Sequence, residues 1–391
     1  GDTAAASRWI GEMLASRCVP DAVTCGVVIN AEAKRGNWED ALSLLSSAAS
    51  STTERPALDE VSYTTLADGC AKRGDIDGAV RWLAAMEAQR FTPNVISYNT
   101  VLDACSRSGD TEQACDWFGR MLMNGVVPNE YTYNTLISAA ARRRNASDAA
   151  HWLGEMAKAQ FAPNKVSYNA VIDAHSKRGD TLGAAWWLER MDAERLTPDE
   201  VSFTSVIHSC SKRGAASEAA RWLRRMCEEQ LQPDTHAHNA VIASYAAAGD
   251  VAGAADELDA MAAAKVAPDV VSYNAVIKSC AKAQDPDSAL RWLEGMADVG
   301  IRPNAITYNT VVGAYAKAGE PDRVADVLDQ MCEVGLELDV VTWTAMLTAC
   351  ANAIPRRREA AERVFAQMLQ SGVKPNRVAE LTLRRAVGKQ R

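Results

Sequence analysis

The sequence predicts an all-α protein built from stacked helix-turn-helix repeats, an α-solenoid. Three observations lead to this prediction. The chain repeats itself every 35 residues, each period carries apolar residues at helical spacing, and Gly and Pro recur where helices end. One helical hairpin cannot bury its own apolar faces, so neighbouring hairpins are expected to stack into a superhelix.

The period divides the chain into units. Eight copies of 35 residues follow one another without a gap over residues 60–339. Residues 22–59 form an earlier copy with three extra residues, and residues 340–376 form a later copy with two. We expect residues 1–21 to be the second helix of a preceding partial repeat. Residues 377–391 begin a further repeat and are expected to act as a partial C-terminal cap.

The first helix of each unit is expected to end at position 15, counted from the first residue of the repeat. Gly recurs there and suits the left-handed conformation that follows a helix. These glycines are Gly74, Gly109, Gly179, Gly214, Gly249 and Gly319. Five cysteines stand at position 11, where we expect them to be small packed residues with free thiols: Cys70, Cys105, Cys210, Cys280 and Cys350. No CxxC pair occurs, which indicates a reducing compartment without a disulfide framework.

The second helix carries an apolar stripe. Met stands at position 27 in all eight regular repeats, Trp at position 23 in six of them, and Ala at position 20 in most. Positions 23 and 27 share a helix face, so the stripe predicts packing between repeats and not a cofactor box. Pro recurs at position 34, as in Pro93 and Pro128, and is expected to stop this helix.

Composition narrows the class of protein. The chain has 391 residues, of which 48% are hydrophobic, so disorder is not expected. No apolar run is long enough to span a membrane. The net charge of −8 argues mildly against bulk nucleic-acid binding, although charges sorted onto different faces weaken that argument. No targeting segment is recognisable, so the compartment cannot be told from the residues themselves.

The units VSYNAVIDAHSKRGDTLGAAWWLERM and VSYNAVIKSCAKAQDPDSALRWLEGM resemble pentatricopeptide repeats of the pure 35-residue class. The resemblance covers essentially the whole chain. It implies a right-handed α-solenoid superhelix that binds single-stranded RNA at one base per repeat. The tetratricopeptide repeat, which binds peptides, is the confusable family, but its period is 34 and its Trp lies in the first helix. A protein-binding helical scaffold of that kind is the alternative function.

Positions 5 and 35 jointly recognise one base in the resembled family. Position 5 is Asn or Thr here, both poor residues for a helix interior, and local capping is the alternative explanation. Position 35 is Asn or Asp, which also suits a turn or N-cap, but the exchange swaps an acceptor oxygen for an amide donor. The expected base-recognising pairs are Thr64 with Asn94, Asn99 with Asn129, Asn134 with Asn164, Asn169 with Asp199, Thr204 with Asp234, Asn239 with Asp269, Asn274 with Asn304, Asn309 with Asp339, and Thr344 with Asn376.

Position 2 packs against neighbouring bases in the resembled family. Here it is mostly apolar, which suits sandwiching of unstacked bases. Burial in the core is the alternative for the valines. The expected base-stacking residues are Val61, Ile96, Tyr131, Val166, Val201, His236, Val271, Ile306 and Val341.

Position 13 is basic in most repeats and predicts a stripe of cations along the phosphates. The alternative is a solvated helix end that complements the helix dipole. The expected phosphate-binding residues are Lys34, Lys72, Arg107, Arg142, Lys177, Lys212, Lys282 and Lys317.

The family's base code, carried over to these pairs, predicts the target 5′-AYYUGUYUA-3′, where Y is a pyrimidine. The base for the Gly26–Asp59 pair stays open. No deaminase motif, nuclease carboxylate cluster, zinc set or phosphate-binding Gly loop is present, so we expect no enzyme, no cofactor and no metal. The resemblance implies a monomer that acts in RNA processing, stability or translation in a mitochondrion or plastid.

Overall fold

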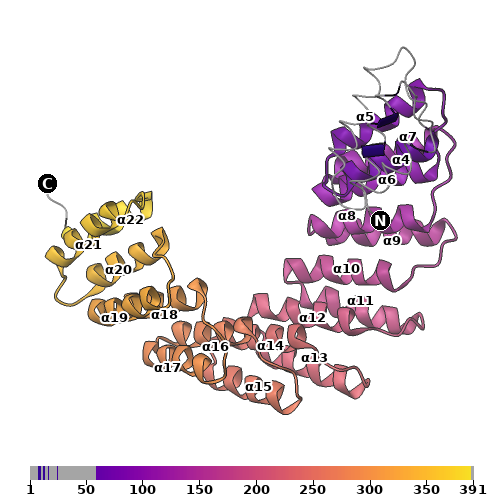
Figure 1. Cartoon of the computed structure of the whole chain (residues 1–391). Coiled ribbons are helices and arrows are strands. Elements are labelled where there is room, and N and C mark those ends of the chain that lie inside the picture. The colour runs from indigo at the N-terminus through magenta and orange to yellow at the C-terminus, as the bar shows by residue number, and fades with distance from the viewer. Residues whose placement is uncertain (1–7, 10–11, 14–15, 17–23, 25–58, 389–391) are drawn as a thin grey trace. The chain divides into compact units, whose positions relative to one another are not determined.

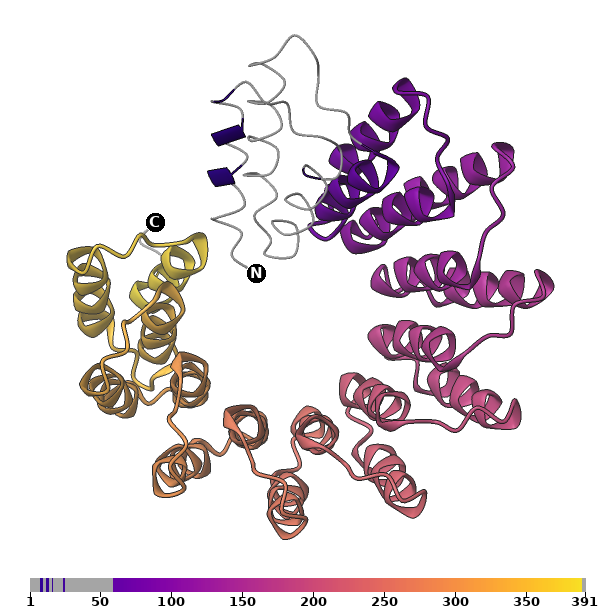
Figure 2. The same ribbon diagram turned by 45° about the vertical axis from the view of Figure 1, so that its right-hand side comes forward.

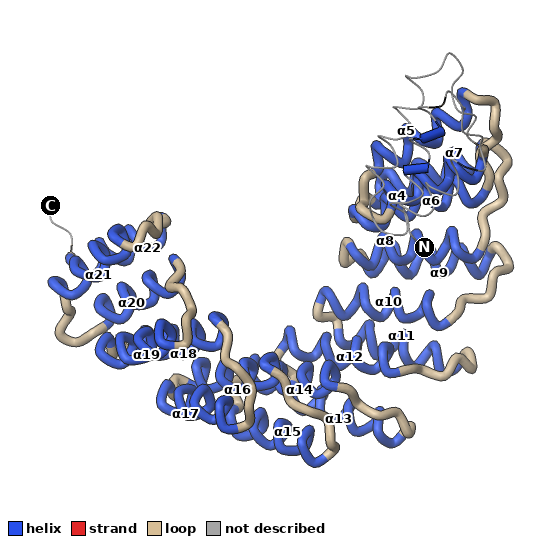
Figure 3. The backbone as a smooth tube through the Cα atoms, in the orientation of Figure 1, coloured by secondary structure: helices blue, strands red, loops and turns tan. Residues whose placement is uncertain are grey.

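The computed structural model describes residues 8–9, 12–13, 16, 24 and 59–388. The described residues form helices and loops without a strand, which confirms the all-α prediction (Figures 1 and 3). Most of the repeat expected over residues 22–59, including Lys34 and Gly26, lies outside the described residues, as does most of 1–21. No helix in the described part of the chain has the length and apolarity needed to cross a membrane.

One set of helices begins at position 1 of each repeat, directly after the Asn or Asp at position 35. Its members are α4 (Glu60–Ala71), α6 (Val95–Ser108), α8 (Glu130–Arg142), α10 (Lys165–Arg178), α12 (Glu200–Arg213), α14 (Thr235–Ala248), α16 (Val270–Ala283), α18 (Ala305–Ala318), α20 (Val340–Asn352) and α22 (Arg377–Val387). We call these the first helices.

The second helices alternate with them. They are α5 (Ile76–Ala88), α7 (Thr111–Met123), α9 (Ala146–Lys158), α11 (Thr181–Ala193), α13 (Ala216–Glu228), α15 (Val251–Ala263), α17 (Pro286–Asp298), α19 (Pro321–Glu333) and α21 (Arg358–Gln370).

The chain divides into two compact units, residues 1–178 with 186–197 and residues 179–185 with 198–391. In the first unit, the first helices pack in series, α4 on α6, α6 on α8 and α8 on α10, while α5, α7 and α9 pack on the first helices beside them. The second unit repeats this pattern from α12 to α22. Within each unit the hairpins therefore stack in two layers, which confirms the α-solenoid (Figure 2).

The core of each unit lies between the layers. In the second unit, Met261, Met296 and Met331 are buried together with Cys280 and Ala289. In the first unit, Met121, Cys70 and Ala79 are buried together, and Trp82 and Trp117 pack against them. Five of the six Trp residues at position 23 also face a ring at position 4, as in the pair of Tyr98 and Trp117, whose ring centroids are 6.3 Å apart. The stripe is therefore core, as the sequence predicts.

The Gly and Pro residues that recur in each period lie beyond the ends of the helices. The six glycines at position 15 have φ between 68° and 81°, so they adopt the left-handed conformation expected there. The expectation that Pro stops the second helix is wrong. Helix α5 ends at Ala88, and Arg90 with φ 66° reverses the chain three residues before Pro93. Pro93 instead lies in the loop that leads to the next first helix.

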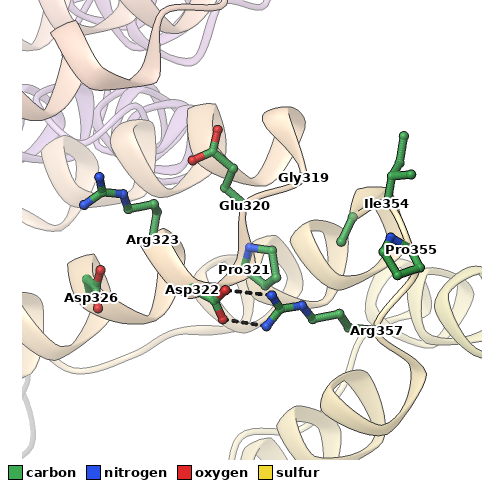
Figure 4. Close-up of a pocket in the computed structure, with 10 residues that line it drawn as sticks. Gly319, Glu320, Pro321, Asp322, Arg323, Asp326, Ile354, Pro355 and Arg357 are labelled. Carbon is green, nitrogen blue, oxygen red and sulfur yellow. Dashed lines mark hydrogen bonds and ion pairs between the residues drawn. The ribbon is translucent and has the colours of Figure 1, made fainter.

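The two extra residues of the repeat at 340–376 lie between α20 and α21. Here Ile354 and Pro355 project beside the start of α19, and Arg357 reaches back to Asp322 (Figure 4). The two guanidinium nitrogens of Arg357 bond the two carboxylate oxygens of Asp322 at 2.6 and 2.7 Å. This bidentate pair ties the insertion to the preceding repeat.

Candidate nucleic-acid interface

Position 2 lies on the surface of the first helix in every described repeat. The apolar side chains there are 56% exposed at Tyr131 and up to 68% exposed at Val61, and His236 is exposed as well. The alternative that the valines are buried in the core is therefore wrong. Because every described first helix except α14, which carries His236, presents one apolar residue at its N-terminal end, both compact units carry a regular series of exposed apolar side chains. Val378, at position 2 of the last copy, extends the series and is 57% exposed.

Position 35 is the N-cap of the following first helix. Its Oδ1 accepts a hydrogen bond from the backbone N–H at position 3, for example at 3.0 Å from Ser202 to Asp199 and at 3.0 Å from Thr307 to Asn304. The same arrangement holds for Asp59, Asn94, Asn129, Asn164, Asp234, Asp269, Asp339 and Asn376. The N-cap explanation is thus confirmed.

This cap determines which atom of the side chain is left for another partner. Since Oδ1 faces the backbone N–H groups, an Asp presents its second oxygen and an Asn presents its amide nitrogen. In Asn94 and Asn164 that nitrogen donates to the carboxylates of Glu60 and Glu130, which stand at position 1 of the same repeats. Sequence reasoning did not single out these two glutamates.

Position 5 lies beside position 35 of the same repeat. Asn99 Nδ2 donates to Asn129 Oδ1 at 3.2 Å, and Asn239 Nδ2 donates to Asp269 Oδ1 at 3.1 Å. Asn99 and Asn239 therefore contact the start of the next first helix and do not cap the helix to which they belong. The threonines differ, since Thr64 and Thr344 donate to carbonyls one turn earlier, those of Glu60 and Val340.

A hydroxyl at position 3 of the following repeat joins this pair, and sequence reasoning missed it. Thr132 Oγ1 donates to Asn99 Oδ1 at 2.7 Å, and Ser272 Oγ donates to Asn239 Oδ1 at 2.6 Å. Ser167 with Asn134 and Thr342 with Asn309 repeat the contact at 2.6 and 3.0 Å. The recurrence of Ser or Thr at position 3 was the available signal.

Hydrogen bonding keeps two of the position-35 carboxyls ionised. Burial alone would raise the pKa of Asp269, but hydrogen bonds from the Ser272 backbone, the Asn239 amide and the Val271 backbone hold it below its usual value. Burial likewise opposes ionisation of Asp339, and the bonds from Thr342 outweigh it and lower the pKa. Both groups are therefore carboxylates near neutral pH.

The basic residues of position 13 lie at the other end of the first helices. Lys72, Arg107 and Lys177 form ion pairs with Asp68, Asp103 and Asp173, at 2.8, 2.7 and 2.6 Å. Each aspartate stands at position 9, one helical turn before its partner. The same position is Ser138 before Arg142, Lys278 before Lys282 and Gly313 before Lys317. The positive charge at position 13 is therefore offset in some repeats and not in others.

The remaining polar chemistry of the described residues offers no metal site, since no group of three potential ligands gathers there. His175 is hydrogen-bonded to Trp187, and the buried His238 contacts Glu257. Neither histidine lies in a cluster of nucleophiles or acids.

Comparison with known protein families identifies the repeats. A model described as the pentacotripeptide-repeat region of PRORP matches residues 50–246, about half of the chain. A model of the PPR repeat family matches residues 268–317 and 303–352, and a further PPR repeat model matches residues 23–48. A comparison with curated proteins gave no match.

The fold also matches a solved structure. The crystal structure of the pentatricopeptide repeat protein PPR10 from maize matches with 23% identity and a TM-score of 0.57. The match covers 99% of this chain and 64% of PPR10, so this chain spans less than two thirds of that relative. Yeast Rmd9p in complex with a 16-nt target RNA matches at 12% identity and a TM-score of 0.47, over 83% of this chain and 75% of that one.

Proposed function

Because this chain belongs to the pentatricopeptide-repeat family, we propose that it binds one single-stranded RNA in a sequence-specific way, at one base per repeat. The observation that supports this most directly is the series of exposed apolar side chains at position 2. Apolar residues that are exposed at the same position of nearly every repeat need a partner. The flat faces of unstacked bases are suitable partners.

The hydrogen-bonding groups beside each apolar residue support base recognition. Position 35 offers an acceptor where it is Asp and a donor where it is Asn, because the cap fixes the orientation of the side chain. Position 5 lies within hydrogen-bonding distance of position 35 in two repeats. Such a pair can match the Watson–Crick edge of one base. The family's code then gives 5′-AYYUGUYUA-3′ for the pairs from Thr64–Asn94 to Thr344–Asn376.

The protein acts by occupying its RNA, as a monomer and without catalysis, and so affects processing, stability or translation of a transcript. PPR10 has been solved in complex with an 18-nt psaJ RNA element, at 22% identity and a TM-score of 0.48. From the family's usual setting, we expect the protein to act in a mitochondrion or plastid.

The test is a binding titration with three ligands. One is 5′-ACCUGUCUA-3′, the second is its complement 5′-UAGACAGGU-3′, which differs at every base, and the third is the duplex of the two. With about 1–3 kcal/mol lost at each mismatched base, the complement should bind at least about a thousandfold more weakly. The duplex should also bind weakly, because its base edges are paired. Equal binding of all three would contradict sequence-specific recognition, and binding of none would favour the protein-binding scaffold.

A further inference from the structure

Three asparagines at position 5 share a hydrogen bond that lies outside the pairing of positions 5 and 35. The side-chain carbonyl of each accepts from a hydroxyl at position 3 of the following repeat. The donors are Thr132, Ser167 and Ser272, and the acceptors are Asn99, Asn134 and Asn239. In a fourth repeat the Thr342 hydroxyl lies 3.0 Å from Asn309 Oδ1 but 2.6 Å from its cap oxygen, Asp339 Oδ1. The contact joins neighbouring hairpins, so it exists only in the stacked solenoid.

The direction of this bond follows from the donors and acceptors around Ser272. Its hydroxyl accepts the Asp269 backbone N–H at 3.1 Å and lies 2.6 Å from Asn239 Oδ1 and 3.0 Å from Asp269 Oδ1. Asp269 Oδ1 already accepts two backbone N–H groups. The single hydroxyl proton therefore goes to Asn239 Oδ1, the nearer and otherwise unoccupied acceptor.

This bond fixes the orientation of the Asn239 amide. With Oδ1 held by the hydroxyl, Nδ2 points to the other side, where it bonds Asp269 Oδ1 at 3.1 Å. An amide can turn by half a rotation and exchange its donor and acceptor ends, because its last torsion has two similar minima. The hydroxyl favours one of the two, and so determines which group position 5 shows to a base.

The residue type at position 3 of each repeat correlates with the residue type at position 5 of the repeat before it. The six asparagines are each followed by a hydroxyl residue at position 3 of the next repeat: Thr132, Ser167, Ser202, Ser272, Thr307 and Thr342. The threonines Thr64, Thr204 and Thr344 are followed by Ser97, Ala237 and Ala379. Alanine thus appears at position 3 only where position 5 is Thr, whose hydroxyl needs no such donor.

Asn274 departs from the pattern. Its Oδ1 is buried without a hydrogen-bond partner, and the nearby hydroxyl of Thr307 donates to the cap oxygen of Asn304 at 3.0 Å. Rotation of the Thr307 hydroxyl proton is a small change, whereas a buried carbonyl without a donor is costly. The unpaired Oδ1 of Asn274 is the same atom that accepts from the position-3 hydroxyl in three other repeats.

We propose that the hydroxyl at position 3 of the following repeat is a positioning residue for base recognition. It holds the position-5 asparagine with its NH₂ group toward the base, so that each Asn-containing site consists of three residues. The proposal rests on the proposed function and extends the two-residue scheme to residues such as Ser272 and Thr132.

The repeat that begins at Glu200 provides a gain-of-function test, because it pairs Thr204 with a following Ala237. Wild type should prefer guanine to uracil at the fifth base. Thr204→Asn alone creates an asparagine without its donor, so it should show little preference for uracil. Adding Ala237→Ser should raise the preference for uracil by about fivefold, the worth of one hydrogen bond. Ala237→Ser alone should keep the preference for guanine.

The outcomes separate the two proposals. If Thr204→Asn alone prefers uracil as strongly as the double variant, the hydroxyl has no positioning role and the inference is wrong. If wild type binds RNA without discriminating at the fifth base, the proposed function itself fails, and the inference falls with it.

A loss-of-function test uses a matched pair of serines. The Ser272 and Ser97 hydroxyls lie at similar distances from their cap oxygens, 3.0 and 3.3 Å, and from a methionine sulfur, 3.8 and 3.7 Å. Only Ser272 also holds an asparagine at position 5. Ser272→Ala should lower the preference for uracil at the sixth base about fivefold. Ser97→Ala should lose similar stability in thermal unfolding but keep the preference for adenine at the first base. Equal loss of base preference in both variants would overturn the proposal.

Discussion

Asp269 shows how one side chain at position 35 serves the fold and the interface together. Its Oδ1 caps α16 through the backbone N–H groups of Val271 and Ser272, both at 2.9 Å. It also accepts from Asn239 of the preceding first helix. These bonds favour the carboxylate and lower its pKa against the effect of burial, so the second oxygen stays a charged acceptor.

Acid should therefore destabilise the second unit. A carboxyl whose pKa is lower in the folded state contributes stability above its unfolded value, near 3.8, and loses it as the pH falls through the folded value. Asp269→Asn keeps the cap, as Asn304 does in the next repeat, but removes the titration. The variant should lose less stability than wild type between pH 5 and pH 3, measured by hydrogen exchange of the α16 amides. An equal loss of stability in both proteins would contradict the lowered pKa of Asp269.

At the scale of the element, the hairpin of α14 and α15 departs from its neighbours. Five other repeats place an aromatic ring at position 4 against Trp at position 23, as in the pair of Phe203 and Trp222, whose centroids are 6.3 Å apart. This hairpin has His238 and Glu257 instead, with 2.7 Å between Nδ1 and Oε1 and side chains only 6% and 12% exposed. His238 Nε2 is buried without a hydrogen-bond partner.

Replacing this buried polar pair by the aromatic pair should stabilise the hairpin. The double variant His238→Phe with Glu257→Trp copies Phe203 and Trp222, and such exchanges gain about 1–4 kcal/mol where the new side chains pack well. His238→Phe alone leaves Glu257 without its partner and should cost about 3–5 kcal/mol. Hydrogen exchange in α14 and α15 reports each change locally. A double variant less stable than the single variant would contradict the argument.

The elements also show what the sequence could and could not predict. The 35-residue period predicted paired helices, the buried Met and Trp stripe and the left-handed glycines, because these features depend on local spacing. The end of the second helix was missed, because a left-handed Arg90 has no distinctive residue type. Ser or Thr at position 3 looks like part of a local capping box. Its bond to the preceding repeat depends on how hairpins stack, which spacing alone does not specify.

At the scale of the whole molecule, the net charge of −8 conceals an uneven distribution of cations along the first helices. Lys72 and Arg107 each pair with an aspartate one turn earlier, whereas position 9 is Lys278 before Lys282 and Gly313 before Lys317. Lys282 also donates to the carbonyl of Ala247 in the preceding repeat, which holds it at the helix end. Contacts with phosphates should therefore be stronger at Lys282 and Lys317.

Salt dependence tests this difference. Lys282→Ala with Lys317→Ala should weaken binding to every RNA alike and lower the slope of log K against log salt by roughly 0.7 per lost phosphate contact. Lys72→Ala with Arg107→Ala should lower it less, because ion pairs with Asp68 and Asp103 already occupy these two cations and weaken their contacts with phosphates. Equal slopes for the two double variants would mean that the ion pairs open on binding. Slopes unchanged from wild type would mean that position 13 faces solvent.

If each repeat recognises one base in the order of the chain, the wild-type protein should select one motif from a random single-stranded RNA pool. The expected motif is 5′-AYYUGUYUA-3′, with guanine at the fifth base, where Thr204 and Asp234 form the pair. Enrichment of no motif, or of one whose bases do not follow the order of the repeats, would contradict recognition of one base per repeat.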